Sequence, residues 1–383
     1  MVMKMRVYLD NGATTRTAPE VVKAMEPYFT EMYGNANSLH SFGEEARSAV
    51  DKSRSCIAEF IKAAADDIIF TSGGTESDNI AIQGVATALR DRGNHIITSK
   101  IEHPAVLETC RALEKQGYKV TYLDVDRYGF VDLQQLEESI TKQTILVTIM
   151  FANNEIGTIQ PVARIGEICH KHNVYFHTDA VQALGKLPID VKKLKIDMLS
   201  ASAHKLHGPK GIGFLYKRKG VKLKPIIYGG GHEFGLRSGT TNTTGIVGFA
   251  KALQLCEQPS RMTELRDKLI KELLKIPDTI LNGHPTERLP NNVNVTFKFI
   301  EGESLLLMLD RYGIAVSTGS ACSSHKLEPS HVLLAIGLKP EEAHGSLRIT
   351  LSRYTTEEEI DYFIDKVKKV VNELRELSPF KSK

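Results

Sequence analysis

Lys205 stands in the segment SASAHKLHGPKGIG, where small and apolar residues give way to a glycine-rich loop. The simplest alternative for a single lysine is a solvated position on the surface. The residues on either side instead predict an enclosed position, where the loss of solvation lowers the pKa of an amine. A neutral amine can form a Schiff base with an aldehyde, so Lys205 is a candidate for attaching an aldehyde cofactor.

A phosphate-binding turn is indicated by FTSGGTESDNIAIQG, in which Gly73, Gly74 and Thr75 separate a predicted strand from a predicted helix. Free backbone N–H groups and the positive end of the helix dipole bind phosphate at such a junction. The spacing matches neither the dinucleotide pattern GxGxxG nor the ATP loop GxxxxGK[ST], which argues against NAD and ATP. The alternative is an ordinary helix start, capped by the side chain of Thr75 or Ser77.

Asp179 and Gln182 follow the predicted strand in VYFHTDAVQALG, at the carboxyl edge where open α/β sheets bind ligands. A carboxylate at the floor of a site can keep a pyridinium nitrogen protonated, as pyridoxal phosphate requires. The alternative is that Asp179 caps a helix. Combined with the phosphate turn and Lys205, the pattern predicts a pyridoxal phosphate site.

Two further strand ends lead to the same edge of the sheet. His103, in SKIEHPAVLE, either caps a helix or stacks on a ring and moves protons. Asn153 and Asn154, in MFANNEIGTIQPV, either form an Asx turn or offer an amide to a ligand.

Cys322 lies in STGSACSSH, a segment of serines and glycine with few apolar residues. A buried cysteine behaves as a small apolar residue, whereas a reactive one needs access and a stabilised thiolate. The composition favours an accessible thiol. Residues 317–328 form the predicted cysteine loop, and the family resemblance described below implies that this loop moves between a binding pocket and the protein surface.

Seven short β-rich runs alternate with helix-like segments between about residues 67 and 215, which predicts an α/β fold. Several of these runs are apolar almost throughout, as strands covered on both faces are, so we expect a mainly parallel seven-stranded sheet. The runs are DIIFTS, HIITSK, KVTYLDV, TILVTIMF, VYFHTDA, DMLSASA and GIGFLYKR.

The large domain built on this sheet is expected to span residues 16–256. Beyond it, SRMTELRDKLIKELLKI predicts an amphipathic helix and NNVNVTFKF a strand. The segment TTEEEIDYFIDKVKKVVNELREL predicts a long helix behind a threonine cap. Residues 1–15 and 257–383 are assigned to a smaller α+β domain that carries the cysteine loop.

The composition is that of an ordinary globular protein, with 383 residues, 42% hydrophobic residues and a formal net charge of +3. Stable nucleic-acid binding is therefore not expected. The start MVMKMRVYLD lacks a long apolar region, and no run approaches the ~18 apolar residues of a membrane span, so we expect a cytoplasmic protein. The cysteines are odd in number and never spaced CxxC, which argues against a disulfide framework and a zinc ribbon.

Eight motifs, in order and over essentially the whole chain, resemble the cysteine desulfurase family, and most closely its iron–sulfur cluster assembly branch. They are YLDNGATT, SGGTESDN, IEHPAV, NNEIGTIQP, HTDAVQALGK, SAHKLHGPKGIG, GGGHEFGLRSGT and STGSACSS with LEPSHVL. The resemblance implies a fold-type I, pyridoxal 5′-phosphate-dependent homodimer that converts L-cysteine to L-alanine and keeps the sulfur as a persulfide. It also implies delivery of that sulfur to an iron–sulfur cluster scaffold protein and to other sulfur acceptors.

The same resemblance assigns roles to single residues. Lys205 would hold the cofactor and move a substrate proton, His103 would stack on the ring and carry protons, and Cys322 would accept the sulfur. Arg348, with Asn154, would bind the substrate carboxylate, and Arg237 is its rival. The other cofactor contacts would come from Gly74, Thr75, Ser202 and His204 at the phosphate, Asp179 at the pyridine nitrogen, Asn154 and Gln182 at the ring oxygen, and Thr240 at the neighbouring subunit's cofactor.

Position 74 is often alanine in relatives of this family, and because both residues are small we expect little consequence from Gly74. Selenocysteine lyase and cysteine sulfinate desulfinase are alternative activities, since they would use nearly the same site. A binding subunit of a cluster-assembly complex is another alternative, in which Cys322 would ligate an iron–sulfur cluster held with a scaffold protein. A nicotinamide dehydrogenase is disfavoured by the missing GxGxxG pattern.

Overall fold

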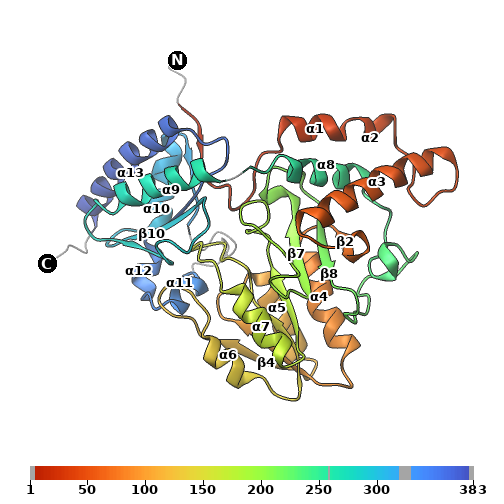
Figure 1. The fold of residues 1–383 in the computed structure, drawn as a ribbon. Coiled ribbons are helices and arrows are strands. Elements are labelled where there is room, and N and C mark those ends of the chain that lie inside the picture. The colour runs from red at the N-terminus through yellow and green to blue at the C-terminus, as the bar shows by residue number, and fades with distance from the viewer. Residues whose placement is uncertain (1–4, 258, 319–328, 379–383) are drawn as a thin grey trace.

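The computed structural model describes residues 5–257, 259–318 and 329–378 of the chain. A larger body surrounds a seven-stranded sheet, and a smaller body packs beside it with the long helix α13 on its outer side (Figure 1).

The central sheet confirms the predicted α/β class and all seven predicted strands. β8 is antiparallel to both of its neighbours, and the other neighbouring strands are parallel. In spatial order the strands are β2 (Ile68–Thr71), β8 (Gly213–Lys217), β7 (Met198–Ser202), β6 (Tyr175–Asp179), β5 (Thr144–Thr148), β3 (His95–Ser99) and β4 (Lys119–Leu123).

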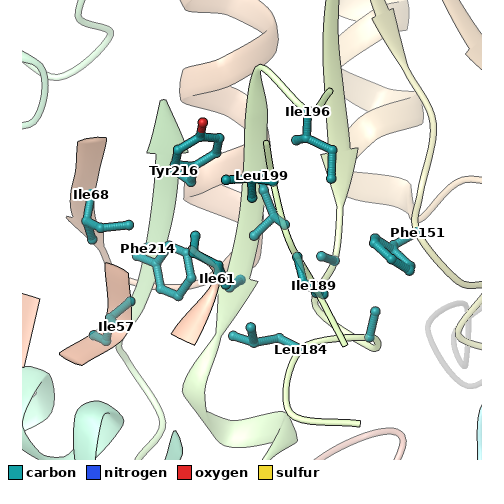
Figure 2. Packing of buried hydrophobic residues seen from close by; sticks show 14 of the residues in the cluster. Ile57, Ile61, Ile68, Phe151, Leu184, Ile189, Ile196, Leu199, Phe214 and Tyr216 are labelled. Carbon is teal, nitrogen blue, oxygen red and sulfur yellow. The ribbon is translucent and has the colours of Figure 1, made fainter. Parts of the chain in front are cut away.

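Helices cover both faces of this sheet because the strands present apolar residues to both sides. In β2, Ile68 and Phe70 join one buried cluster and Ile69 joins another, as the two-residue period of a strand requires. Figure 2 shows Phe214 of β8 and Leu199 of β7 projecting into the first cluster. The helices of the larger body are α1 (Pro19–Met25), α2 (Pro27–Thr30), α3 (Ser41–Phe60), α4 (Gly74–Ala88), α5 (Pro104–Glu114), α6 (Leu133–Ser139), α7 (Val162–Lys171) and α8 (Thr243–Gln254).

The smaller body has its own antiparallel sheet and its own apolar core. The sheet order is β12 (Ser346–Thr350), β10 (Asn292–Phe297) and β9 (Thr279–Leu281), and β1 (Val7–Tyr8) pairs in parallel with β11 (Ile314–Ala315). Its helices are α9 (Ser260–Leu273), α10 (Gly302–Arg311), α11 (His331–Ala335), α12 (Pro340–His344) and α13 (Glu357–Leu377).

Two sequence expectations bear on this smaller body. The predicted threonine cap is confirmed, because the Glu359 N–H donates to the Thr356 hydroxyl and the Thr356 N–H donates to the Glu359 carboxylate. Val7 and Leu9 are buried in one cluster with residues of α9, β10 and α13. That packing supports grouping residues 1–15 with 257–383, and the boundaries near residues 15 and 256 stay a prediction.

Within the part of the chain that the structure describes, no helix is long and apolar enough to cross a membrane.

Candidate active site

A cavity of about 280 Å³ lies at the carboxyl edge of the central sheet. Parallel strands bring the residues that follow them to this edge, which is where open α/β sheets bind ligands. Residues after β2, β3, β5, β6 and β7 line the cavity, with others from the first segment of the chain and from β12. Of the residues assigned from sequence, it brings together Gly74, Thr75, His103, Asn154, Asp179, Gln182, Ser202, His204, Lys205 and Arg348.

The start of α4 forms one end of the cavity. The Ser77 hydroxyl donates to the Gly73 carbonyl at 3.1 Å, and no N–H of the helix bonds to the side chain of Ser77 or Thr75. The alternative of a helix start capped by these two residues is therefore wrong. N–H groups at the start of this 15-residue helix, together with its dipole, are suited to bind a phosphate group.

His204 and Ser202 line the same cavity beside this helix start. Burial, followed by the charges of Lys205, Lys210 and Lys186, lowers the pKa of His204 to about 4. The ring Nδ1 lies 3.1 Å from the Thr14 hydroxyl. Near neutral pH His204 is thus an uncharged imidazole, whose ring can donate one hydrogen bond to an anion.

Asp179 ends β6 and is 7% exposed at the floor of the cavity. Its Oδ1 accepts a 2.9 Å hydrogen bond from the Val181 N–H in the turn after β6, where no helix begins, so the alternative of a helix cap is wrong. Burial raises the pKa of the Asp179 carboxyl group, an effect that nearby His103 opposes. Gln182 donates from Nε2 to the Gly12 carbonyl at 3.0 Å. A buried carboxylate of this kind is suited to pair with a ring N–H⁺.

His103 caps a helix and also lines the cavity, and its roles in ring stacking and proton transfer stay predictions. Its Nδ1 accepts a 3.1 Å hydrogen bond from the Ala105 N–H at the start of α5, and its ring lines the cavity. Burial lowers its pKa, although the Asp179 carboxylate acts in the opposite direction. The two neighbouring amides differ. The Asn153 side chain forms the Asx turn, because it accepts from the N–H groups of residues 155 and 156. Asn154 lines the cavity, where its binding of a ligand stays a prediction.

The Lys205 ammonium contacts the first segment of the chain. Its Nζ donates to the carbonyl of Gly12 at 2.5 Å and to that of Ala13 at 2.8 Å. Sequence reasoning gave these two residues no role, although they lie in YLDNGATT directly after β1. Their small side chains were the only sign in the sequence that another group could approach their backbone. The lysine that does so is 193 positions from Gly12 and 192 from Ala13, so local sequence could not identify it.

Arg348 is 4% exposed and reaches the cavity from β12. Its Nη2 lies 2.9 Å from Asp10 Oδ1, its Nη1 donates to the Asn154 carbonyl at 3.3 Å, and its buried Nε has no hydrogen-bond partner. The rival Arg237 instead pairs with Glu76 at 2.7 Å. A guanidinium that lines a cavity is suited to bind a carboxylate.

These residues fit pyridoxal phosphate by the chemistry of their donor set. An uncapped helix start can hold the phosphate, a buried carboxylate can hold the ring nitrogen, and a lysine amine can hold the aldehyde carbon. The Arg348 guanidinium, which lines the same cavity, is suited to hold the carboxylate of an amino acid beside the cofactor. Within the described residues, no group of three or more histidine, cysteine, aspartate or glutamate side chains is placed to hold a metal ion.

We expected little consequence from glycine instead of alanine at position 74, but the structure leaves no room there for an alanine side chain. A Cβ atom at this position would lie 2.5 Å from Cγ2 of Val181, which also lines the cavity. That separation is well inside the ~3.5–4.0 Å of a normal carbon contact. Glycine at position 74 is therefore matched to valine at position 181.

Cys322, with the loop movement expected around it, is outside the described residues. The described flanks lie close to the cavity: Ser317 pairs with Arg348 through two backbone hydrogen bonds, and the Ser330 hydroxyl donates to the buried Glu155 carboxylate at 2.5 Å. Thr240 is exposed and does not line the cavity of its own chain.

Comparison with known families extends over nearly the whole chain. Residues 7–363 match the family model described as aminotransferase class-V. The chain is 56% identical to cysteine desulfurase IscS of Methanosarcina thermophila, over 98% of this chain and 95% of the relative. It is 53% identical to cysteine desulfurase IscS of Dictyoglomus turgidum, over 99% and 98%.

Solved structures show the same similarity. A NifS-like protein superimposes with a TM-score of 0.91 at 44% sequence identity, covering 97% of this chain and all of that one. SspA in complex with cysteine superimposes with a TM-score of 0.83 at 40% identity, covering 91% of this chain and all of that one.

Proposed function

Because the chain belongs to the class-V aminotransferase family and, within it, to the pyridoxal phosphate-dependent cysteine desulfurases, we propose that the cavity described above converts L-cysteine to L-alanine with transfer of sulfur. One observation carries the assignment of the site. A lysine, a buried carboxylate, an uncapped helix start and an arginine with an unsatisfied Nε line a single cavity.

Gly74, Thr75, Ser202 and His204 would hold the phosphate of the cofactor, and Asp179 would hold its pyridine nitrogen. Asn154 and Gln182 would face the oxygen side of the ring, and His103 would stack on it. When bound, pyridoxal phosphate takes the amino group of the substrate and draws electrons from its α-carbon. The protein's part is to fix the ring and the substrate so that the α-proton can leave.

Lys205 is the proposed base for that proton, since it lines the cavity together with Asp179 and its Nζ lies at the Gly12 carbonyl, whose residue also lines the cavity. Arg348, with Asn154, would bind the substrate carboxylate, since both residues line the cavity and the Arg348 Nη1 donates to the Asn154 carbonyl. His103 would return a proton to the substrate, because its imidazole lines the same cavity as Lys205; burial lowers its pKa, so the ring is suited to take up a proton and pass it on.

Cys322 is the proposed sulfur acceptor. Its thiolate would attack the substrate sulfur, the C–S bond would break with its electron pair left on carbon, and protonation of that carbon would complete alanine. The products are alanine and a Cys322 persulfide, so atoms and electrons balance. Anchoring of residues 317 and 330 beside the cavity supports this role.

The assignment is tested by incubating the purified protein with L-cysteine and measuring alanine, together with mass mapping of a sulfur adduct to Cys322. We expect Lys205→Ala to abolish the visible absorption of the bound cofactor and the activity. Cys322→Ala should keep the absorption and lose cysteine turnover. A wild-type protein that turns over selenocysteine or a sulfinate but not cysteine would favour the alternative activities instead.

We also propose a homodimer in which Thr240 reaches the phosphate of the neighbouring subunit's cofactor. The exposure of Thr240 outside its own cavity supports this role. The exposed apolar side chains of Phe29 in α2 and of Tyr33 and Leu39 between α2 and α3 support a subunit interface. Light scattering should give twice the 42.5 kDa of one chain. A monomer that retains full cofactor affinity would contradict the role of Thr240.

An iron–sulfur cluster scaffold protein and other sulfur acceptors are the proposed partners, and ligation of a cluster by Cys322 would belong to a complex with such a scaffold. A cytoplasmic location is proposed as well, and it is supported by the free thiols of Cys56, Cys110, Cys169 and Cys256, which persist best in a reducing compartment. Transfer of labelled sulfur from the persulfide to a purified scaffold protein tests the partner assignment.

A further inference from the structure

A second cavity, of about 140 Å³, lies between the two bodies of the protein, and none of the roles above uses it. Residues of the larger body line one side, and residues of α9 and of the segment after β12 line the other. Lys205 belongs to the walls of both cavities. The volume of the second cavity is roughly ten times the ~10–15 Å³ that one water needs, so it has room for several non-hydrogen atoms. Spaces between domains are common ligand sites.

The charged residues that line the second cavity are mainly cations. Lys186, Lys205, Arg261 and Arg353 line it together with one acid, Glu257. Arg261 and Glu257 are exposed to solvent, whereas Lys186 and Arg353 are partly buried. Burial, followed by the charge of Lys205, lowers the pKa of Lys186 to about 8, so its ammonium form prevails near neutral pH.

Lys186 and Arg353 have only uncharged partners in the part of the chain that the structure describes. The Lys186 ammonium donates to the Gln182 carbonyl at 2.8 Å. The Arg353 guanidinium donates to the Leu255 carbonyl at 2.5 Å and to the Tyr354 hydroxyl at 3.0 Å. Neither cation therefore has, among the described residues, the counter-charge that a desolvated position favours.

The charged groups of Lys186 and Arg353 act on the same part of the wall. Burial raises the pKa of the Cys256 thiol to about 11, and the charges of Lys186 and Arg353 both oppose that rise. Burial lowers the pKa of His207 to about 4, an effect that the hydrogen bond to Arg16 opposes and the two cations strengthen. Since Cys256 and His207 line the second cavity, both cations lie near it and favour an anion as its occupant.

His207 supplies a hydrogen-bond acceptor beside these cations. It is 7% exposed, and its Nδ1 lies 3.0 Å from the Arg16 carbonyl oxygen, which can only accept. The proton of the neutral ring is therefore on Nδ1, and Nε2 carries a lone pair. Among the described residues, none donates a hydrogen bond to this Nε2. A ligand that can donate a hydrogen bond there matches the wall better than one that cannot.

Apolar side chains complete the wall of the second cavity. Leu206 comes from the segment after β7, Met262 and Leu265 come from α9, and Leu351 directly follows β12. A short alkyl group is stabilised against such side chains because its apolar surface leaves water. The second cavity thus combines two cations, a hydrogen-bond acceptor and an apolar surface.

We propose that the second cavity is a binding site for a small hydroxycarboxylate. Its carboxylate would pair with Lys186 and Arg353, its hydroxyl would donate to Nε2 of His207, and its alkyl group would lie on the apolar side chains. Amino acids fit less well, because Lys186 and Arg353 repel an ammonium group. The site therefore discriminates against cysteine and alanine, and it does not depend on the reaction proposed for the first cavity.

The ligand chemistry is tested on the wild-type holoenzyme by calorimetric titration with L-lactate, L-lactamide and propionate. L-Lactamide lacks the negative charge, so it should bind about 10- to 100-fold more weakly than L-lactate. Propionate lacks the hydroxyl group, so it should bind about 3- to 10-fold more weakly. Absence of L-lactate binding, or equal affinity for either analogue, would overturn the proposal.

Residue changes locate the bound L-lactate. Lys186→Met removes the ammonium and keeps a long side chain, so the Kd for L-lactate should rise about 10- to 100-fold. The matched control is Lys193→Met, at a lysine whose side chain is 85% exposed, and it should bind like the wild type. Arg348→Lys should also bind L-lactate like the wild type, because Arg348 lines the first cavity and not the second.

An unchanged Kd in Lys186→Met would overturn the proposal, and a raised Kd in Arg348→Lys would place the ligand in the first cavity instead. The comparison of the three ligands needs only the wild type, so it remains decisive even if Lys186→Met does not fold.

Discussion

Replacing Gly74 by alanine tests the packing at the phosphate end of the site. The new Cβ would lie 2.5 Å from Val181 Cγ2, about 1 Å or more inside a normal carbon contact. Overpacking of this kind costs ~1–3 kcal/mol. Since Val181 lines the cavity, its displacement changes the wall that the cofactor meets. If the whole cost falls on the bound state, the Kd for pyridoxal phosphate rises about 5- to 150-fold.

The assay is calorimetric titration of pyridoxal phosphate into protein stripped of it, with Val181→Ala and the double variant beside Gly74→Ala. Removing Cγ2 removes the clashing atom, so the double variant should bind much like Val181→Ala alone. The resulting interaction free energy should be about 1–3 kcal/mol, because the two residues share one contact.

Two outcomes would refute this reasoning. One is wild-type affinity in Gly74→Ala, which would mean that Val181 yields without effect on the site. The other is a double variant whose loss of affinity equals the sum of the two single losses, because the clash would then not be the cause.

Three other predictions concern the surroundings of the cavity. Arg348→Lys keeps the charge but loses the planar guanidinium that can bind a carboxylate through two N–H groups, so the KM for L-cysteine should rise about 10- to 100-fold while the cofactor absorption is unchanged; an unchanged KM would remove Arg348 from substrate binding. Burial raises the pKa of Glu155 to about 7, so the stability contributed by its protonated form is lost as pH rises from the ordinary value of 4.5 through about 7, and Glu155→Gln lacks this contribution. The urea midpoint of the wild type should therefore fall relative to that of Glu155→Gln between pH 5 and pH 8, and parallel profiles would contradict the assignment. Glu233→Gln leaves the buried Arg54 guanidinium, now 2.8 Å from both carboxylate oxygens, without its counter-charge, at a cost of ~3–5 kcal/mol. Proteases should then cut residues 229–240 faster, and wild-type resistance would show that this ion pair does not hold the segment.

The central sheet could be predicted from sequence because its strands carry a local signal. Apolar runs such as TILVTIMF and DMLSASA reflect strands buried on both faces, and β5 and β7 are fully buried. Asp179 and Lys205 were recognisable as candidates for a related reason, since each follows such a run and strand ends meet at one edge.

The contacts that close the cavity carry no comparable signal. Arg348 pairs with Asp10, 338 positions earlier in the chain, and the Lys205 ammonium bonds to the carbonyl of Gly12. Neither contact is visible in local composition, because the first joins two distant segments of the smaller body and the second depends on how that body packs on the larger one. Asp78 also lines the cavity, but its sequence does not single it out as a site residue. An aspartate in a helix is normally solvated, and only the packing of α4 on the sheet buries this one.

The dependence of the cavity on both ends of the chain has a consequence for synthesis on the ribosome. The central sheet is complete once residue 217 has emerged, but Asp10 must wait for β12, which ends at residue 350. At ~5–20 residues per second, that wait lasts roughly 20–70 s after Asp10 is made. Only the part of this wait after residue 217, roughly 7–27 s at the same rate, is spent with a formed sheet and an open site, and cofactor capture belongs to the last stage of maturation.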